Sequence, residues 1–251
     1  MPELHDPLLL FAMALAVFLA GLINGVVGMG FAQLMAAGLA LIVDPKAAIV
    51  LLSITVPITA GMQVIKRRAQ ARHARRIGRL LVAGLAGVPL GVALLTLMPT
   101  RTVALLLGIF TILFVATSIR KTPLRLSPGG ERLVAPLVGL TAGICNGALG
   151  VSGPILAGYL LTLDLPAAAF GFTISVLFAA LSLLRLASLV VAGEVSLPLV
   201  AVGLGLLGPG LVGQQVGFWL QDRISQEAFR RGALVLMLVA GLGLLRRGLT
   251  L

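Results

Sequence analysis

Long apolar segments, separated by short polar stretches, follow one another along the 251-residue chain. They cover residues 8–43, 46–65, 80–98, 102–119, 133–163, 167–192, 198–220 and 228–245. Most have about the 20 residues that an α-helix needs to cross a bilayer, whereas 8–43 and 133–163 are too long for one such helix. The pattern predicts an all-α, polytopic transmembrane helix bundle of about 8–10 spans, with each long segment a broken helix or helical hairpin.

A glycine-asparagine motif occurs twice, as GLINGVVGMG at 21–30 and as GICNGALGVSG at 143–153. The two copies lie 122 residues apart (143 minus 21), and this offset holds across most of the chain. We therefore expect a first transmembrane repeat at 1–119, a polar basic linker at 120–132 and a second repeat at 133–251. Paired glycine-rich interruptions in long apolar segments mark the centre of many transporters, so we expect the helices to be broken at these motifs.

Composition excludes a soluble protein. Hydrophobic residues make up 59% and charged residues 11% of the chain, and its mean hydropathy is +1.12. Charged residues are roughly 25% of a typical soluble domain. The single cysteine, Cys145, has no partner for an internal disulfide and no metal-ligand spacing. We expect a multi-pass membrane protein, with no metal, no cofactor and no catalytic residues.

The net charge of +11 is concentrated in polar loops, above all in KRRAQARHARRIGR at 66–79. A basic loop between two apolar spans is typical of the cytoplasmic side, so the charge does not indicate a nucleic-acid partner. Inverted and parallel repeats place nearly equal numbers of loop Lys and Arg inside. Loops that match under the offset have opposite charge bias, however, and this favours inverted repeats.

The paired G-x-x-N-G-x-x-G elements at 21–28 and 143–150, the duplication, the polar linker and the length together resemble the sulfite exporter TauE/SafE family of bacterial membrane transporters. The resemblance implies transport of sulfite, a sulfonate such as sulfoacetate, or a related small sulfur-containing or organic anion across the bacterial inner membrane. It implies a role in the motif for Gly21, Asn24, Gly25, Gly28, Gly143, Asn146, Gly147 and Gly150.

The motif has a chemistry suited to anions. A helix that resumes after a break directs its N–H groups and its positive end toward a cavity, and asparagine amides add donors. The alternative is that the asparagines only satisfy the loosened backbone. We predict a substrate site at the repeat interface near the membrane midplane, from the motif residues Asn24, Gly25, Gly28, Asn146, Gly147 and Gly150, with Ser152, Gln33, Gln63, Arg185 and Gln214 around them.

Arg185 is the charged residue that lies deepest in an apolar segment. Such residues usually face a cavity or a partner, and a guanidinium matches two oxygens of an oxyanion. The alternative is that Arg185 snorkels to the interface. Gln63, 122 residues earlier, is its polar counterpart in the first repeat. Gln214 has helix–helix hydrogen bonding as its alternative role.

Other function classes find less support. No Asp or Glu lies deep in an apolar segment, so a carboxylate proton relay is not expected. Gly150-Val151-Ser152-Gly153 resembles an intramembrane serine protease motif, but His5 and His73 lie in a tail and a loop, too far to serve as base. The remaining alternative is a non-transporting scaffold or assembly factor, with loop 66–79 docking a partner or anionic lipid. Substrate, direction, coupling and oligomeric state stay open, a homodimer included.

Overall fold

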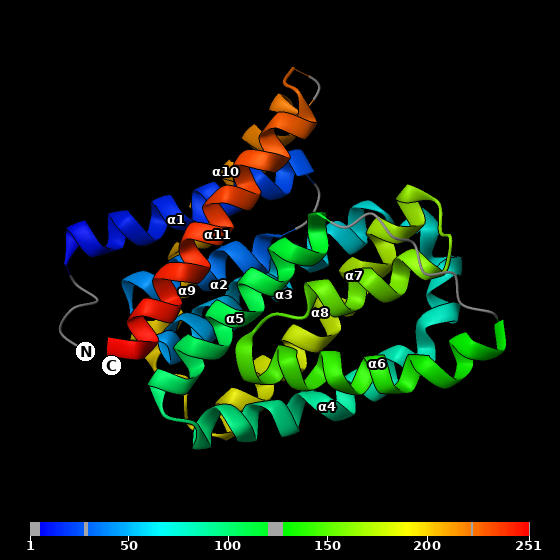
Figure 1. The fold of residues 1–251 in the computed structure, drawn as a ribbon, viewed down its shortest axis with the longest axis horizontal. Helices are drawn as coiled ribbons and strands as arrows, with labels where there is room; N and C mark the ends of the chain where they lie inside the picture. Colours follow the sequence, from blue (N-terminus) through cyan, green and yellow to red (C-terminus); the bar gives the residue numbers. More distant parts are fainter. Residues whose placement is uncertain (1–5, 28–29, 120–127, 222, 251) are drawn as a thin grey trace. The chain divides into compact units, whose positions relative to one another are not determined.

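The computed structural model describes residues 6–27, 30–119, 128–221 and 223–250, and within these ranges it contains helices and no strands (Figure 1). The elements are α1 Pro7–Val27, α2 Phe31–Ile42, α3 Pro45–Lys66, the 3₁₀ helix η2 Arg68–Ile77, α4 Gly78–Leu97, α5 Thr100–Ile119, α6 Pro128–Leu149, α7 Gly153–Thr162, α8 Ala167–Val191, α9 Leu197–Gly205, α10 Leu207–Leu220 and α11 Gln226–Thr250. Within the described residues, eight stretches are long and apolar enough to cross a membrane, with α9 and α10 counted together as one. The chain is a multi-pass membrane protein.

The two longest apolar segments each contain one long and one short helix. Segment 8–43 holds α1 and the 12-residue α2, and segment 133–163 holds α6 and the 10-residue α7. At 1.5 Å per residue, α2 and α7 are about 18 and 15 Å long, too short to cross about 30 Å of hydrocarbon. The chain leaves α6 at Gly150, which has a left-handed φ of 76°, and enters α2 at Gly30, which has a φ of 99°. Glycine adopts these conformations without the strain that a side chain would add.

Two other helix boundaries follow from proline. α6 begins at Pro128, inside the predicted linker 120–132, because a proline at the start of a helix lacks only an N–H that would have no partner there. α9 ends at Gly205 and α10 begins at Leu207. Pro209 cannot donate to the carbonyl of Gly205, so the helix is interrupted at Leu206.

The described helices form two compact units. The first comprises Met1–Thr55, Met98–Thr117 and Val195–Leu251, and the second comprises Val56–Leu97 and Ser118–Glu194. Each unit thus contains segments from both predicted repeats, and the assignment of 1–119 and 133–251 as separate repeats stays a prediction. In the first unit α1 packs mainly against α10 and α2; in the second, α4 packs mainly against α6 and α8.

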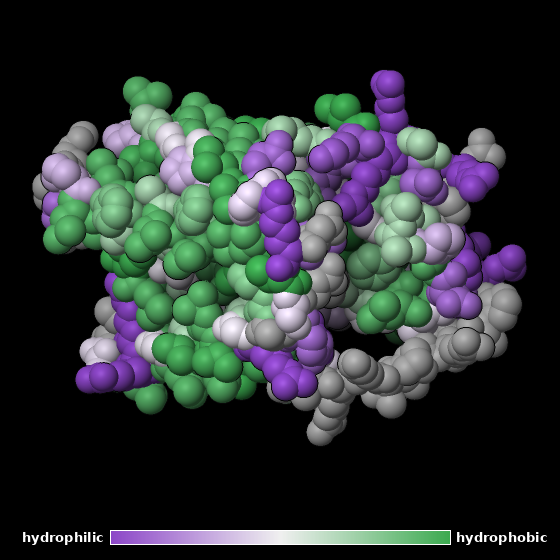
Figure 2. Space-filling model, turned by 90° about the horizontal axis from the view of Figure 1, so that it is seen from above, coloured by the Kyte–Doolittle hydropathy of each residue, from purple (hydrophilic) through white to green (hydrophobic). Residues whose placement is uncertain are grey.

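Large apolar side chains are exposed on the helices, and apolar residues cover much of the surface that Figure 2 shows. Leu8, Leu97, Val191 and Leu197 are among the most exposed. A soluble monomer rarely exposes apolar patches of this extent, whereas a lipid-facing surface requires them. The outward-facing leucines and valines therefore agree with the membrane assignment.

Candidate functional site

In each unit, two helices cross and pack closely at glycine residues. We call this glycine crossing the packing frame of the unit. In the first unit, a methyl group on Gly21 or Gly25 of α1 would collide with the carbonyl oxygens of Gly210 or Gln214 of α10. Conversely, a methyl group on Gly217 of α10 would collide with the carbonyl oxygen of Leu22. Only glycine allows the two backbones to approach this closely, and in lipid such close packing stabilises a helix pair.

The second unit repeats this crossing with α6 and α4, which lie side by side in Figure 1. Methyl groups on Gly143 and Gly147 of α6 would collide with the carbonyl oxygens of Gly84 and Val88 of α4. In the opposite direction, a methyl group on Gly91 of α4 would collide with the carbonyl oxygen of Ile144. The contact pairs therefore match those of α1 and α10 one by one.

This correspondence reveals a second repeated motif that the sequence analysis missed. GLAGVPLG at 84–91 of α4 corresponds to GLVGQQVG at 210–217 of α10, with its glycines at the same spacing. The offset here is 126 residues (210 minus 84), one helical turn more than 122. A search at variable offset would have found the motif.

The asparagines of the motif lie beside these contacts, inside the helices. Asn24 and Gly25 belong to α1, and Asn146 and Gly147 belong to α6. Gly25 and Gly147 thus pack against a neighbouring helix, and the chain leaves the helix only after them. Gly150 lies directly after α6, whereas Gly28, the corresponding residue of the first copy, lies outside the described residues.

The second unit contains a fully buried polar cluster formed by Arg185, Asn146 and Ser152, which are 0%, 1% and 0% exposed. Nη1 of Arg185, on α8, donates to the backbone carbonyl of Asn146 at 3.0 Å and to its Oδ1 at 3.3 Å. The Asn146 amide in turn donates to Oγ of Ser152, the residue before α7, at 3.3 Å. The cluster joins the end of α6, the start of α7 and the interior of α8. Since Arg185 is completely buried, it does not snorkel.

The electrostatic surroundings of this cluster are positive. α7 begins at Gly153, so its positive N-terminal end lies next to Ser152. Arg185 adds a full positive charge, and its bond to the carbonyl of Asn146 stabilises the C-terminal end of α6. The N–H of Gly150 donates to the same carbonyl at 2.9 Å. A guanidinium, a helix N-terminus and a serine hydroxyl are groups that bind oxyanions.

Among the residues that the structure describes, the first unit contains buried amides and no buried charge. The amide nitrogen of Gln33, on α2, donates to Thr111 Oγ1 of α5 at 2.7 Å, while Thr111 donates to Leu107 O. Because the hydroxyl proton is used there, Thr111 accepts from Gln33. Oε1 of Gln33 and Nε2 of Gln214 have no hydrogen-bond partner among the described residues, and both residues are buried.

Most hydroxyls within the spans bond to their own helix. Those of Ser53, Thr55 and Thr59 donate to carbonyls of α3, and those of Thr173 and Ser175 to carbonyls of α8. These groups therefore satisfy their own backbone, which is common for hydroxyls in membrane helices. Ser182 of α8 differs: it is 1% exposed, and its Oγ has no hydrogen-bond partner within the described part of the chain. Sequence reasoning missed Ser182, because a serine in an apolar helix normally bonds in this way.

The remaining predicted residue, Gln63, is part-exposed in the last turns of α3 and does not belong to the cluster of Arg185, Asn146 and Ser152. The structure thus brings together Arg185, Asn146 and Ser152 in one unit. In the other unit it places Asn24, Gln33 and Gln214 in buried positions. Within the described ranges, no group of three His, Cys, Asp or Glu side chains is arranged to hold a metal ion.

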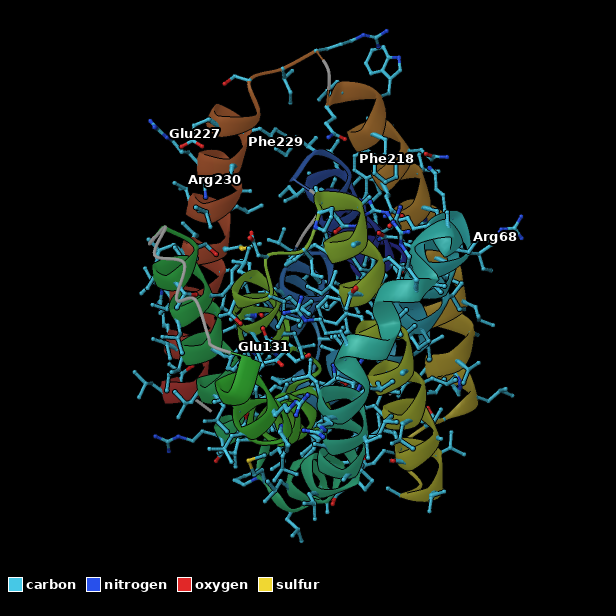
Figure 3. All side chains as sticks on the ribbon, turned by 90° about the vertical axis from the view of Figure 1, so that its right-hand side faces the viewer. Arg68, Glu131, Phe218, Glu227, Phe229 and Arg230 are labelled. Carbon is cyan, nitrogen blue, oxygen red and sulfur yellow. The ribbon has the colours of Figure 1, made fainter. Side chains whose placement is uncertain are left out.

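Arginines also fix the C-terminal ends of the short helices. Arg76 of η2 donates to the carbonyl of Leu163, directly after α7, at 3.0 Å, and it pairs with Glu131 at 2.6 Å. Arg247 of α11 donates to the carbonyls of Ala40 and Val43, at the end of α2, at 2.6 and 3.1 Å. By contrast, Arg68, which belongs to η2 like Arg76, points away from the helices (Figure 3). Cations suit the negative C-terminal ends of helices.

Comparison with known proteins gives one result for the whole chain. The family model described as sulfite exporter TauE/SafE matches residues 13–244. No curated protein and no solved structure matches the chain significantly.

Proposed function

Because the chain belongs to the sulfite exporter TauE/SafE family, we propose that it exports a small oxyanion, a sulfite, a sulfonate or a related organic anion, across the bacterial inner membrane. The anion binds at the cluster of Arg185, Asn146 and Ser152. Arg185 supplies the charge, Asn146 holds the guanidinium in place, and the start of α7 with Ser152 supplies further donors.

One observation carries the proposal: a guanidinium that is completely buried within a candidate membrane span and held against the Gly-Asn motif. Ionisable residues at such positions are costly and usually serve function. Fixing the guanidinium through Nη1 orients the planar group before substrate arrives, which lowers the entropy lost on binding.

Export of an anion is favourable without a coupling ion. An inside-negative membrane potential drives each negative charge outward by about 2.3 kcal/mol per 100 mV. The candidate spans carry no Asp or Glu beyond Glu131, which is the second residue of its span, so no carboxylate is placed for a proton relay. Uniport is therefore the mechanism that we expect.

Inverted repeats are also part of the proposal, and the two arginine contacts support them. η2 touches the end of α7 through Arg76, and one span, α3, separates the end of α2 from η2. Arg247 touches the end of α2, and three spans separate it from the end of α7: α8, the α9–α10 pair and α11. Both counts are odd, so the corresponding ends of α2 and α7 lie on opposite faces of the membrane.

Flux into sealed proteoliposomes tests the function. Sulfite, thiosulfate, methanesulfonate and a panel of carboxylates are supplied under an imposed potential of either sign. We expect saturable flux that reverses with the potential, and a loss of about 10- to 100-fold in Arg185→Gln, because a hydrogen-bonded charge is removed. Arg185→Lys is expected to restore flux only in part, since an ammonium cannot reproduce the planar fork.

Arg246→Gln is the matched control, because it makes the same chemical change at an exposed position of α11. Its flux should equal that of the wild type. A wild-type protein that inserts correctly yet carries none of these anions at either potential would contradict the proposal and favour the scaffold alternative.

Labelling of single cysteines tests the inverted arrangement. In a Cys145→Ala background, Lys46→Cys and Ala168→Cys mark the first turns of α3 and α8, exactly one repeat offset of 122 residues apart. An impermeant maleimide should label Lys46→Cys from outside and Ala168→Cys only after the membrane is opened. Labelling of both from the same side would indicate parallel repeats.

A further inference from the structure

Ser182 is an exception among the hydroxyls of its own helix. Thr173, Ser175 and Ser188 of α8 each donate to the carbonyl four residues earlier, at 2.6, 2.7 and 2.9 Å. The hydroxyl of Ser182 lies on the same helix and is 1% exposed, yet it has no hydrogen-bond partner among the described residues. Buried hydroxyls nearly always have a partner, so this one is a candidate to bind a ligand.

Ser182 also lies on the face of α8 that carries the buried charge. Residues three apart on a helix are neighbours on one face, and Ser182 precedes Arg185 by three. Long helical side chains lean toward the N-terminus and cover the preceding turn. The Arg185 side chain therefore extends over the turn that contains Ser182, on its way to Asn146 of α6.

We propose that the hydroxyl of Ser182 donates a hydrogen bond to an oxyanion held by Arg185, and that Ser182 thereby sets a preference for anions with three oxygens on one central atom. This inference rests on the proposed function and adds a selectivity-determining residue to the site. A guanidinium matches two oxygens in one plane, which is all that a carboxylate offers. The third oxygen of a sulfonate or sulfite lies out of that plane and requires its own donor, which Ser182 provides.

Binding to the purified protein tests the selectivity without a vesicle. Methanesulfonate and acetate share a methyl group and a single charge and differ in the number of oxygens. We expect calorimetric titration of the wild type to show tighter binding of methanesulfonate. In Ser182→Ala its dissociation constant should rise about 10-fold, as for a lost hydrogen bond to a charged group, while that of acetate changes less than about twofold.

Two control variants separate a ligand contact from a structural role. Ser188→Ala removes a hydroxyl that donates to the carbonyl of Leu184 in its own helix, and it should leave both dissociation constants unchanged. Ser182→Thr keeps the hydroxyl and should retain the preference for methanesulfonate. The thermal midpoint of Ser182→Ala should equal or exceed that of the wild type, because a hydroxyl without a partner is removed from the interior.

Three results would overturn the inference: a wild type that binds both anions equally, a Ser182→Ala variant with unchanged methanesulfonate binding, or a variant that loses both anions alike. Failure of the proposed function has a different signature, because the wild type would then bind methanesulfonate selectively but carry no anion across proteoliposomes.

Discussion

The two compact units share a packing frame and differ in their chemistry. In each unit, two helices cross on glycines, α1 with α10 in the first and α4 with α6 in the second, and the colliding glycine and carbonyl positions correspond. The buried polar groups correspond only in part: Asn24 matches Asn146 and Ser53 matches Ser175, but the groups around them differ. Arg185 lies against Asn146 in the second unit, whereas the first holds the uncharged Gln33 and Gln214.

This difference separates two requirements: close helix packing, which both units meet with glycine, and charge for anion binding, which one unit supplies. Backbone contact through glycine depends on geometry alone, so both units need the same residues at the same spacing. Anion binding depends on charge, and one buried cation is enough for one anion, while a second would add a large cost of burial. The frame is therefore duplicated, whereas the fully buried charge found among the described residues lies in one unit.

The largest expected effect comes from filling the glycine crossings. Gly143→Leu and Gly21→Leu place a side chain where a backbone carbonyl lies, so rotamer changes cannot relieve the clash. We expect each to destabilise the protein by more than about 3 kcal/mol and to abolish a monodisperse peak in size-exclusion chromatography.

Gly158→Ala is the control for both, because a methyl group there meets no atom within 4 Å. It should leave the thermal midpoint unchanged or raise it, as alanine favours the helix by about 0.5–1 kcal/mol. A loss in Gly143→Leu but not in Gly21→Leu would show that the two frames are not equivalent.

A smaller effect is expected from the amides of the first unit. Gln33→Leu removes the bond to Thr111 but also the carbonyl oxygen without a partner among the described residues. These changes oppose each other, so stability should shift by less than about 1 kcal/mol and flux by less than about threefold. A loss of flux as large as that of Arg185→Gln would move the anion site to the first unit.

The arginines at the ends of the short helices should contribute less than the glycines and unequally. Arg247→Gln removes two bonds to backbone carbonyls from a part-buried group, at a cost of about 1–2 kcal/mol. Arg76 is about half exposed and paired with Glu131, so Arg76→Gln should cost about 1 kcal/mol or less. Thermal midpoints at low and high salt would test this, since only the exposed pair should be sensitive to salt.

The smallest effect should come from acidification near the start of α11. Arg231 and Arg230 lower the pKa of Glu227, which lies with Arg230 at the exposed end of that helix (Figure 3). A carboxylate with a lowered pKa stabilises the folded state above its unfolded pKa of about 4.3, and this contribution is lost as the pH falls through the folded value. Because the pair is exposed, the midpoint difference between wild type and Glu227→Gln should change by no more than about 1 °C between neutral and acid pH.

The spans were readily predicted from the sequence, because lipid requires long uninterrupted apolar stretches. All eight segments contain helices within a few residues of the expected bounds. Arg185 was singled out for the same reason, since a charge in such a stretch needs an explanation, and its burial agrees with a role inside the protein. Its role in binding stays a prediction.

Three features could not be predicted from a fixed repeat offset and local pattern. The motif at 84–91 and 210–217 is shifted by one turn relative to the first motif. The pairing of α1 with α10 joins distant parts of the chain, and nothing local in α1 specifies its partner. The hydroxyl of Ser182 has no hydrogen-bond partner among the described residues, and composition and spacing do not predict this.

The crossing of α1 with α10 also bears on how the protein is made. Gly21 is synthesised and inserted long before Gly210, whereas Gly84 and Gly143 leave the ribosome close together. The second unit can therefore assemble while translation continues, but α1 must stay in the bilayer without its partner until α10 arrives. During that interval the glycine face of α1 is open to lipid, to an insertase or to a holding chaperone. The first unit is complete only when the last quarter of the protein has been inserted.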